Sequence, residues 1–191
     1  IEKHKSGSKV FDWKVPEEWN ISEAYVLKDK QRVIDFKKNN LHVVNYSTPI
    51  NKKISLNKFQ KHLFSLKKYP NFIPYVTSYY KKFWGFCIEH KKRTKLKKGT
   101  YHVVIKSKIK KGYVEYGIKK IKGNSNKIML LTSYLCHPSM ANNELSGPLV
   151  MLGLYQKILG WKKRNLNYYF LINPETIGSI CFLSKYGNFL K

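Results

Sequence analysis

The sequence predicts an α/β fold in which a β-α-β unit with parallel strands follows a mostly β module. Two runs, 127–135 and 167–172, are almost continuously apolar, as is typical of strands in a sheet with both faces covered. An apolar helical stretch separates them. Before residue 125, short runs rich in β-branched and aromatic residues recur between turn-prone clusters. We therefore expect two domains, 1–125 and 126–191.

The first domain is expected to be antiparallel and interrupted by one helix. Ser55 suits the N-cap of that helix, and Leu56, Phe59, Leu63 and Leu66 follow at three- and four-residue spacing, which predicts one apolar face through Lys67. The predicted strands are Ala24 to Leu27, Arg32 to Phe36, Leu41 to Tyr46, Phe83 to Ile88, Tyr101 to Lys106 and Gly112 to Ile118. The opening run, Ile1 to Lys9, is expected to be solvated.

The second domain alternates strands and helices. Its predicted elements are a strand at Lys127 to Leu135, a loop at Cys136 to Ser146, a helix at Gly147 to Leu159 that Gly160 ends, a strand at Asn167 to Ile172, a loop at Asn173 to Thr176 and a helix at Ile177 to Leu190. This order implies parallel strands. Because one such unit is not a stable sheet by itself, we expect the sequence to stop part-way through an α/β domain.

Charge is the most conspicuous feature of the composition. The 191 residues include 37 Lys and Arg against 11 Asp and Glu, a formal net charge of +26, which ordinarily suggests nucleic acid or an anionic membrane as partner. Only Arg32, Arg93 and Arg164 are arginines, however, and abundant Lys, Asn and Ile are typical of an AT-rich coding sequence. We therefore expect scattered lysines and no nucleic-acid partner. A basic nucleic-acid-binding module is the rival interpretation.

The sequence also bears on location. No stretch approaches the ~18 apolar residues of a membrane span, so no membrane partner is expected. Cys87, Cys136 and Cys181 are widely spaced, which favours reduced thiols in the cytoplasm over a disulfide framework. We expect Cys136 to be a buried thiol. Because the chain begins at Ile1 without a Met, we expect its natural N-terminus to lie outside this sequence.

The loops after the two apolar strands carry the best candidates for chemistry. The carboxyl ends of parallel strands meet at one sheet edge, where ligands bind in open α/β folds. His137 in the first loop and Glu175 in the second are residue types that suit zinc and related divalent metals. A structural interpretation stays open: His137 before Pro138 could cap a strand, and Glu175 could complement a helix dipole.

Longer motifs carry a resemblance to a known family. The chain resembles the aminopeptidase-like proteins encoded beside surface-polysaccharide biosynthesis genes, which are related to the bimetallic zinc aminopeptidases. The matching segments cover nearly the whole chain and are Ser6 to Trp13, Val15 to Asn20, Pro74 to Tyr80, Trp84 to Cys87, Leu131 to Pro148 and Pro174 to Ser179.

This resemblance implies the start of a zinc-aminopeptidase-like α/β domain with a mostly β inserted module. Residues 1–125 would be the β-rich inserted module with a flanking segment, and 126–191 the first β-α-β unit of an incomplete aminopeptidase-like domain. In the family a helical segment precedes this stretch, and further strands, ligands and a C-terminal module follow it. We therefore expect both ends to be missing.

The resemblance also implies a ligand set. His137 matches the first zinc-ligand histidine, and Glu175 falls in the carboxylate cluster that supplies the general base and a metal ligand. Asn143 occupies the position of the metal-bridging aspartate, although a neutral amide bridges two dications poorly. Glu144, next to it, could compensate with its longer side chain. The implied cofactor is one or two zinc ions, with His137, Asn143, Glu144 and Glu175 as metal-site residues and Glu175 as the catalytic one.

The implied function is a fragment of a metal-dependent aminopeptidase-like hydrolase, which acts on a peptide-like or amide small-molecule substrate in surface-polysaccharide biosynthesis. We expect this chain alone to be inactive. The alternative is a non-catalytic relative with a small-molecule or glycan-binding role, and a homo-oligomer is a further open alternative. The remaining histidines, His4, His42, His62, His90 and His102, are interpreted as structural or exposed. Five aromatic residues, Tyr75, Tyr79, Tyr80, Phe83 and Trp84, are interpreted as strand core in preference to a stacking surface.

Overall fold

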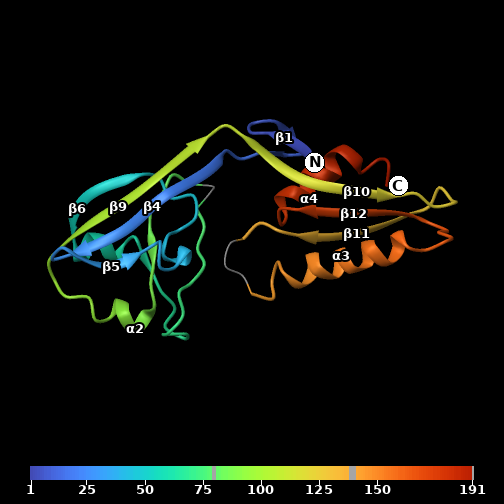
Figure 1. Ribbon diagram of the computed structural model, residues 1–191. Coiled ribbons are helices and arrows are strands. Elements are labelled where there is room, and N and C mark those ends of the chain that lie inside the picture. The colour runs from blue at the N-terminus through green and yellow to red at the C-terminus, as the bar shows by residue number, and fades with distance from the viewer. Residues whose placement is uncertain (79–80, 138–140, 191) are drawn as a thin grey trace. The chain divides into compact units, whose positions relative to one another are not determined.

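The chain forms two structural units, which the computed structural model describes over residues 1–78, 81–137 and 141–190. Unit 1 consists of Ile1–Glu17 and Lys111–Lys191, and unit 2 is the continuous segment Glu18–Lys110 (Figure 1). This grouping differs from the predicted division at residue 125. The reason is the strand at Tyr113–Ile121, which we assigned to the β-rich module but which pairs with strands of unit 1.

Unit 1 contains a four-stranded mixed sheet in the order β1-β10-β12-β11. Its strands are β1 (Glu2–Lys5), β10 (Tyr113–Ile121), β11 (Ile128–Tyr134) and β12 (Asn167–Asn173). β11 and β12 are parallel, which confirms the predicted β-α-β unit, while β1 and β10 run antiparallel to their neighbours. β1 corrects the expectation of a solvated opening run, because Glu2 to Lys5 pair with Tyr113 to Tyr116.

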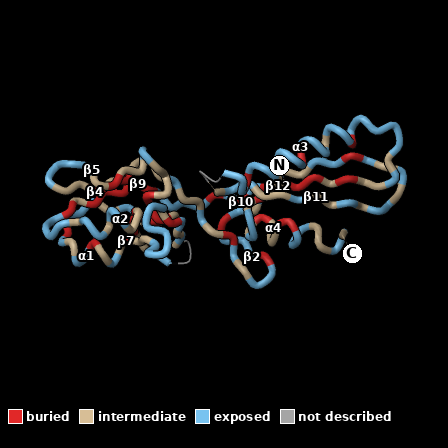
Figure 2. The backbone as a smooth tube through the Cα atoms, turned by 90° about the horizontal axis from the view of Figure 1, so that it is seen from below, coloured by how far each residue is buried: buried red, intermediate tan, exposed pale blue. Residues whose placement is uncertain are grey.

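Two helices cover opposite faces of this sheet (Figure 2). α3 (Ser146–Leu159) packs Met151 and Ile158 on Tyr168 and Phe170, and α4 (Ile177–Tyr186) packs Cys181 and Phe182 on Leu171 and residues of β10. Tyr168 and Phe170 face α3 whereas Leu171 faces α4, because successive side chains of a strand point to opposite faces. α3 begins one residue before the predicted start at Gly147. α4 begins at Ile177 as predicted but ends at Tyr186 instead of Leu190. A small hairpin of β2 (Lys9–Val10) and β3 (Trp13–Lys14) also belongs to unit 1.

β11 differs from the prediction in its burial. We expected both of its faces to be covered, but within the described residues it is the edge strand of the sheet, and Met129 is 45% exposed. Its only described strand neighbour is β12. α3 packs on one face of β11, and Leu130 packs against the cluster that includes Cys181 and Phe182 of α4. Leu149, Val150 and Leu152 of α3 are also exposed. Together these side chains leave an apolar surface on the α3 side of unit 1.

Unit 2 is built on an antiparallel sheet in the order β5-β4-β9-β6. Its strands are β4 (Glu18–Lys28), β5 (Gln31–Asp35), β6 (Ile50–Ser55) and β9 (Thr100–Lys110). Asp29 and Lys30 both have positive φ, which suits the two-residue turn between β4 and β5. Val26, Ile34, Phe59, Phe86 and Tyr101 lie in its buried core.

The remaining elements of unit 2 are short, and several predictions there are wrong. The helix predicted to reach Lys67 ends at Gln60, because Leu63 and Phe64 form a parallel bridge pair with Phe86 and Cys87. The predicted strands at 41–46 and 83–88 shrink to a 3-10 turn and a two-residue strand, and β6 was not predicted. These elements are η1 (Asn40–His42), α1 (Leu56–Gln60), β7 (Leu63–Phe64), β8 (Phe86–Cys87) and α2 (His90–Arg93). In the part of the chain that is described, no helix has the length and apolar character needed to cross a bilayer.

Candidate metal centre

The candidate site forms where two neighbouring parallel strands end. Tyr134, the last residue of β11, is the register partner of Asn173, the last residue of β12. The chain continues beyond each strand into a loop, and the amide of Leu135 still donates to the carbonyl of Asn173 at 3.0 Å. His137 and Glu175 therefore leave the same edge of the sheet.

The structure brings His137 and Glu175 together as predicted. His137 Nε2 lies 3.7 Å from Glu175 Oε2, and the two side chains are 22% and 48% exposed. Both are therefore open to solvent. The convergence follows from the strand-end rule, because each residue comes two or three positions after its strand.

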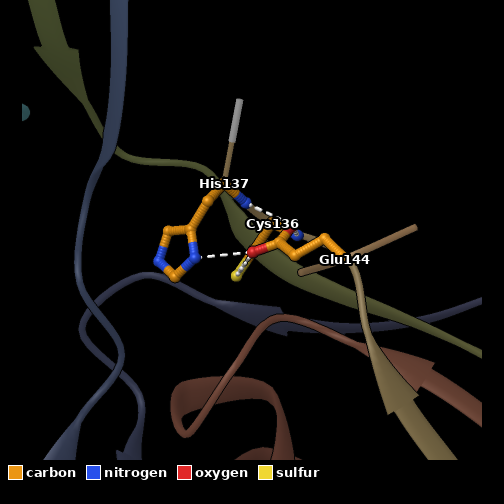
Figure 3. A group of neighbouring side chains, drawn as sticks. All are labelled: Cys136, His137 and Glu144. Atoms are coloured by element: carbon orange, nitrogen blue, oxygen red, sulfur yellow. Dashed lines mark hydrogen bonds and ion pairs between the residues drawn. The ribbon is translucent and has the colours of Figure 1, made fainter. Parts of the chain in front are cut away.

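Glu144 is the buried acid of the site. Its side chain is 3% exposed, and its Oε1 lies 2.5 Å from His137 Nδ1 (Figure 3). Its Oε2 accepts hydrogen bonds from the amides of Cys136 and His137, at 2.5 Å and 2.6 Å. Burial pushes the pKa of Glu144 upward, but these hydrogen bonds outweigh it and the pKa is lowered, so the carboxylate stays ionised at neutral pH.

Cys136 is a member of the site that the sequence interpretation did not assign. Its thiol was expected to be buried, but the residue is exposed, and its sulfur lies 3.5 Å from Glu144 Oε1. Adjacent residues of a strand point to opposite faces, but β11 ends at Tyr134 and does not include this pair. Cys136 and His137 therefore both reach Glu144. Desolvation is the main cause that raises the pKa of the Cys136 thiol to about 11, and Glu144 adds to it.

Asn173 supports the second loop, and we gave it no role from the sequence. It is 3% exposed, its Nδ2 donates to Ser179 Oγ and the Pro174 carbonyl at 2.9 Å and 2.8 Å, and its Oδ1 accepts from Thr132 at 3.3 Å. The sequence signal that could have identified it is an amide side chain directly after an apolar strand, because such a group needs partners when it is buried.

Backbone strain flanks the candidate ligands. Glu144 and Thr176 have φ angles of 68° and 57°, in the left-handed region that side chains other than Gly and Asn rarely adopt. The Thr176 backbone, with ψ of −65°, turns tightly enough for the amide of Ile177 to donate to the Glu175 carbonyl at 2.6 Å. Strain of this kind persists where the surrounding contacts enforce it, which is common at functional sites.

Asn143 and the other histidines complete the set of sequence-derived candidates. Asn143 is exposed in the turn before α3, and its place in a metal site stays a prediction. Among the described residues, the group of His, Cys and acidic side chains close enough to hold an ion is Cys136, His137 and Glu144. The other histidines make structural contacts: His42 with the Cys87 carbonyl, His62 with the Trp84 carbonyl, His90 with Ser65, His102 with Asn51 and His4 with Tyr116.

The five aromatic residues that we interpreted as strand core differ in their environment. Trp84 stacks on His62 with ring centroids 3.7 Å apart, and Phe83 also stacks on His62, at 5.1 Å. Tyr75 is exposed, which differs from the expected core position, and its hydroxyl accepts from Asn45 Nδ2. Tyr79 and Tyr80 lie outside the described residues.

A curated protein is similar to this chain along the chain's whole length. A Clostridium acetobutylicum protein named "Putative polysaccharide biosynthesis protein with aminopeptidase-like domain" is 46% identical over 192 residues. The alignment includes the whole of this chain. The resemblance read from the motifs is confirmed. This chain spans 44% of the length of that relative.

A family model and a solved structure also match this chain. Residues 18–108 match the family described as "Domain of unknown function (DUF2172)", which coincides closely with unit 2. The crystal structure of a "putative peptidase" from Clostridium acetobutylicum matches 98% of this chain and 44% of its own, with 44% identity and a TM-score of 0.92.

A more distant structure shows the fold alone. The zinc aminopeptidase BSAP from Bacillus subtilis matches 90% of this chain and 52% of its own, with 13% identity and a TM-score of 0.57. The α/β architecture is therefore shared with an aminopeptidase, whereas the inserted position of the β-rich module in such a domain stays a prediction.

Proposed function

We propose that this chain carries the first metal-binding residues of a metal-dependent, aminopeptidase-like hydrolase that acts on a peptide-like or amide substrate. The observation that supports this most is the 3.7 Å separation of His137 Nε2 and Glu175 Oε2 at the end of the parallel strand pair. The name of the curated relative supports a place in polysaccharide biosynthesis.

The separation of these two atoms fits one shared ion. Zinc binds imidazole nitrogen and carboxylate oxygen at roughly 2.0 to 2.2 Å, so two ligands of one ion lie no more than about 4.2 Å apart. The distance of 3.7 Å is within that limit. Imidazole and carboxylate are also the donor types that zinc and its neighbours accept. The residues present therefore fit a zinc ion held by His137 and Glu175, with further donors from elsewhere in a whole protein.

A bound zinc ion would supply a water of lowered pKa and a Lewis acid for the substrate carbonyl. The residues of this chain would hold that ion, as follows. His137 would donate its Nε2 lone pair to the ion, and its ring would be held from the Nδ1 side. Glu175, whose side chain is 48% exposed beside His137, would serve either as a ligand of the ion or as the general base.

One observation favours the alternative of a non-catalytic relative. Asn143 stands where the resemblance places a bridging aspartate, and an amide brings no charge to offset two dications. A chain that binds its ligand without hydrolysis would serve as a small-molecule or glycan-binding protein. The two functions differ in whether zinc is needed.

Zinc calorimetry on the 191-residue chain tests the proposal. We expect the wild type to bind zinc and His137→Ala or Glu175→Gln to bind at least tenfold more weakly. His102→Ala is the matched control, because His102 contacts Asn51 in unit 2. Equal affinity in wild type and His137→Ala would overturn the proposal. Glycan binding that persists in chelator would favour the non-catalytic alternative.

A further inference from the structure

Glu144 holds His137 through a set of contacts that involve both of its carboxylate oxygens. Oε2 accepts from the amides of Cys136 and His137, and Oε1 lies 2.5 Å from His137 Nδ1 and 3.5 Å from the Cys136 sulfur (Figure 3). The carboxylate is thus fixed to the loop backbone as well as to the imidazole. At 3% exposure its side chain exchanges few of these partners for water.

These contacts determine which nitrogen of His137 carries the hydrogen. An ionised carboxylate can only accept, and a neutral imidazole has one N–H. The close approach of Oε1 to Nδ1 therefore requires the N–H to be at Nδ1. The lone pair is then at Nε2, the nitrogen that faces Glu175.

The same distances argue against Glu144 as a ligand of a shared ion. Two ligands bound at about 2.1 Å to one zinc ion, even at a right angle, lie about 3 Å apart. The 2.5 Å between Oε1 and Nδ1 is a hydrogen-bond distance and is too short for that arrangement. Oε2 already accepts from two amides.

We propose that Glu144 is a positioning residue, which fixes the tautomer and ring orientation of His137 so that Nε2 is presented to a metal beside Glu175. This inference rests on the proposed function, and it replaces the sequence-based expectation of Glu144 as a ligand. Carboxylates that hold the far nitrogen of a ligand histidine in this way commonly tune metal affinity.

The backbone of Glu144 is consistent with this role. Its φ of 68° suits Asn or Gly, and Asn142 and Asn143 directly precede it. A glutamate in that conformation is disfavoured unless its side chain contributes something that the shorter residues cannot. The reach to His137 Nδ1 is such a contribution.

Nitrogen-15 NMR of the metal-free wild type tests the inference directly. The neutral ring of His137 is expected to show the Nδ1–H tautomer. Loss of the assigned signals in His137→Ala identifies them among the six histidines. A wild-type Nε2–H tautomer would overturn the inference, and this measurement requires no variant at residue 144.

Glu144→Gln tests the cause. Its amide oxygen can still accept from the loop amides, but its NH2 group would face Nδ1 and favour the Nε2–H tautomer. We expect that change of tautomer, with zinc affinity 10- to 100-fold lower. Glu115→Gln is the matched control, since Glu115 is an exposed acid of unit 1 that pairs with Lys3. An unchanged tautomer and affinity in Glu144→Gln would contradict the proposal.

Cadmium-113 loading of the wild type separates a positioning role from ligation. We expect scalar coupling from the cadmium to Nε2 of His137, whereas coupling to Nδ1 would show a metal on the Glu144 side and overturn the inference. Failure of the wild type to bind zinc or cadmium would overturn the proposed function. The tautomer of the metal-free protein decides the role of Glu144 in either case.

Discussion

The backbone amide of Glu175 donates a hydrogen bond to the sulfur of Cys136, with 3.2 Å between the nitrogen and the sulfur. This contact joins the loop after β11 to the loop after β12. Because Cys136 also contacts Glu144, the thiol connects the buried acid of the first loop to the exposed acid of the second. The rate at which the Cys136 thiol reacts therefore depends on whether both loops keep these contacts.

Alkylation of Cys136 is expected to be slow in the folded chain. With a pKa of about 11, its thiolate fraction at about pH 8 is on the order of 10²-fold below that of free cysteine, whose pKa is about 8.5. Iodoacetamide with mass spectrometry measures the rate, and the urea-unfolded chain is the control. Modification of the native thiol as fast as free cysteine would contradict the site geometry. Cys87 and Cys181 are buried and should react only on unfolding.

Phe59→Ala is expected to destabilise unit 2 strongly. The Phe59 ring is fully buried, stacks on Tyr101 at 5.5 Å between centroids and meets Phe86 edge-on. Removing it should lower the free energy of unfolding by about 3 to 5 kcal/mol. Urea unfolding followed by tryptophan fluorescence measures this. Phe72→Ala, at an exposed position, should change it by no more than about 0.5 kcal/mol, and equal effects would refute this account of the core.

Gly123→Ala tests a close backbone approach in unit 1. A Cβ at Gly123 would lie 2.0 Å from the Leu166 carbonyl oxygen and 2.9 Å from that of Arg164, and neither backbone atom can move freely. We expect a loss of about 1 to 3 kcal/mol in the free energy of unfolding. Gly153→Ala in α3 is the control, because nothing lies within 4 Å of its Cβ, and it should gain about 0.5 to 1 kcal/mol. Similar results for both variants would show that the contact is absent.

Acid should weaken the contribution of Glu144 to stability. Its pKa in the folded chain is lower than in the unfolded chain, so its stabilising effect is fully present above the unfolded value of about 4.3. The effect is lost as the pH falls through the lower folded value. Wild type should therefore exceed Glu144→Gln in urea midpoint at neutral pH, and the difference should shrink in acid. A difference independent of pH would mean that the charge of Glu144 contributes nothing.

The apolar surface of α3 is expected to cause self-association at high salt. Leu149, Val150 and Leu152 are more than half exposed, and no lysine or arginine occurs between Lys127 and Lys157. The net charge of +26 opposes association, and salt screens it. Sedimentation velocity at low and high salt measures this. Val150→Glu should reduce association, Ile109→Glu on β9 should not, and association that weakens as salt rises would contradict the expectation.

Some of the site could be predicted because it depends on local pattern and on one topological rule. The apolar runs at β11 and β12 and the glycine after α3 define the β-α-β unit. The rule that parallel strands end at one edge then brings His137 and Glu175 together. The orientation of Glu144 could not be predicted, because it depends on a left-handed backbone angle at a residue type that rarely adopts one. Cys136 was misplaced because the end of β11 was set one residue too late.

The fold of unit 2 was harder to predict for a different reason. Leu56, Phe59, Leu63 and Leu66 have helical spacing, yet Leu63 is buried by pairing with Phe86, a residue 23 positions away. Short strands that depend on distant partners leave little local signal. The same holds for β1, where Glu2 to Lys5 are all polar, alternate only in their burial and pair across more than a hundred residues.

The register of unit 2 bears on the order in which the chain folds. Glu18 and Lys110, its first and last residues, are pairing partners in β4 and β9, whereas β1 of unit 1 must find β10 across the whole of unit 2. Once unit 2 has folded, the chain separating β1 from β10 is effectively about 15 residues instead of about 110. The logarithmic dependence of closure entropy on loop length makes that shortening worth roughly 2 kcal/mol. We expect unit 2, the continuous segment, to fold first and to bring together the two chain segments that form unit 1.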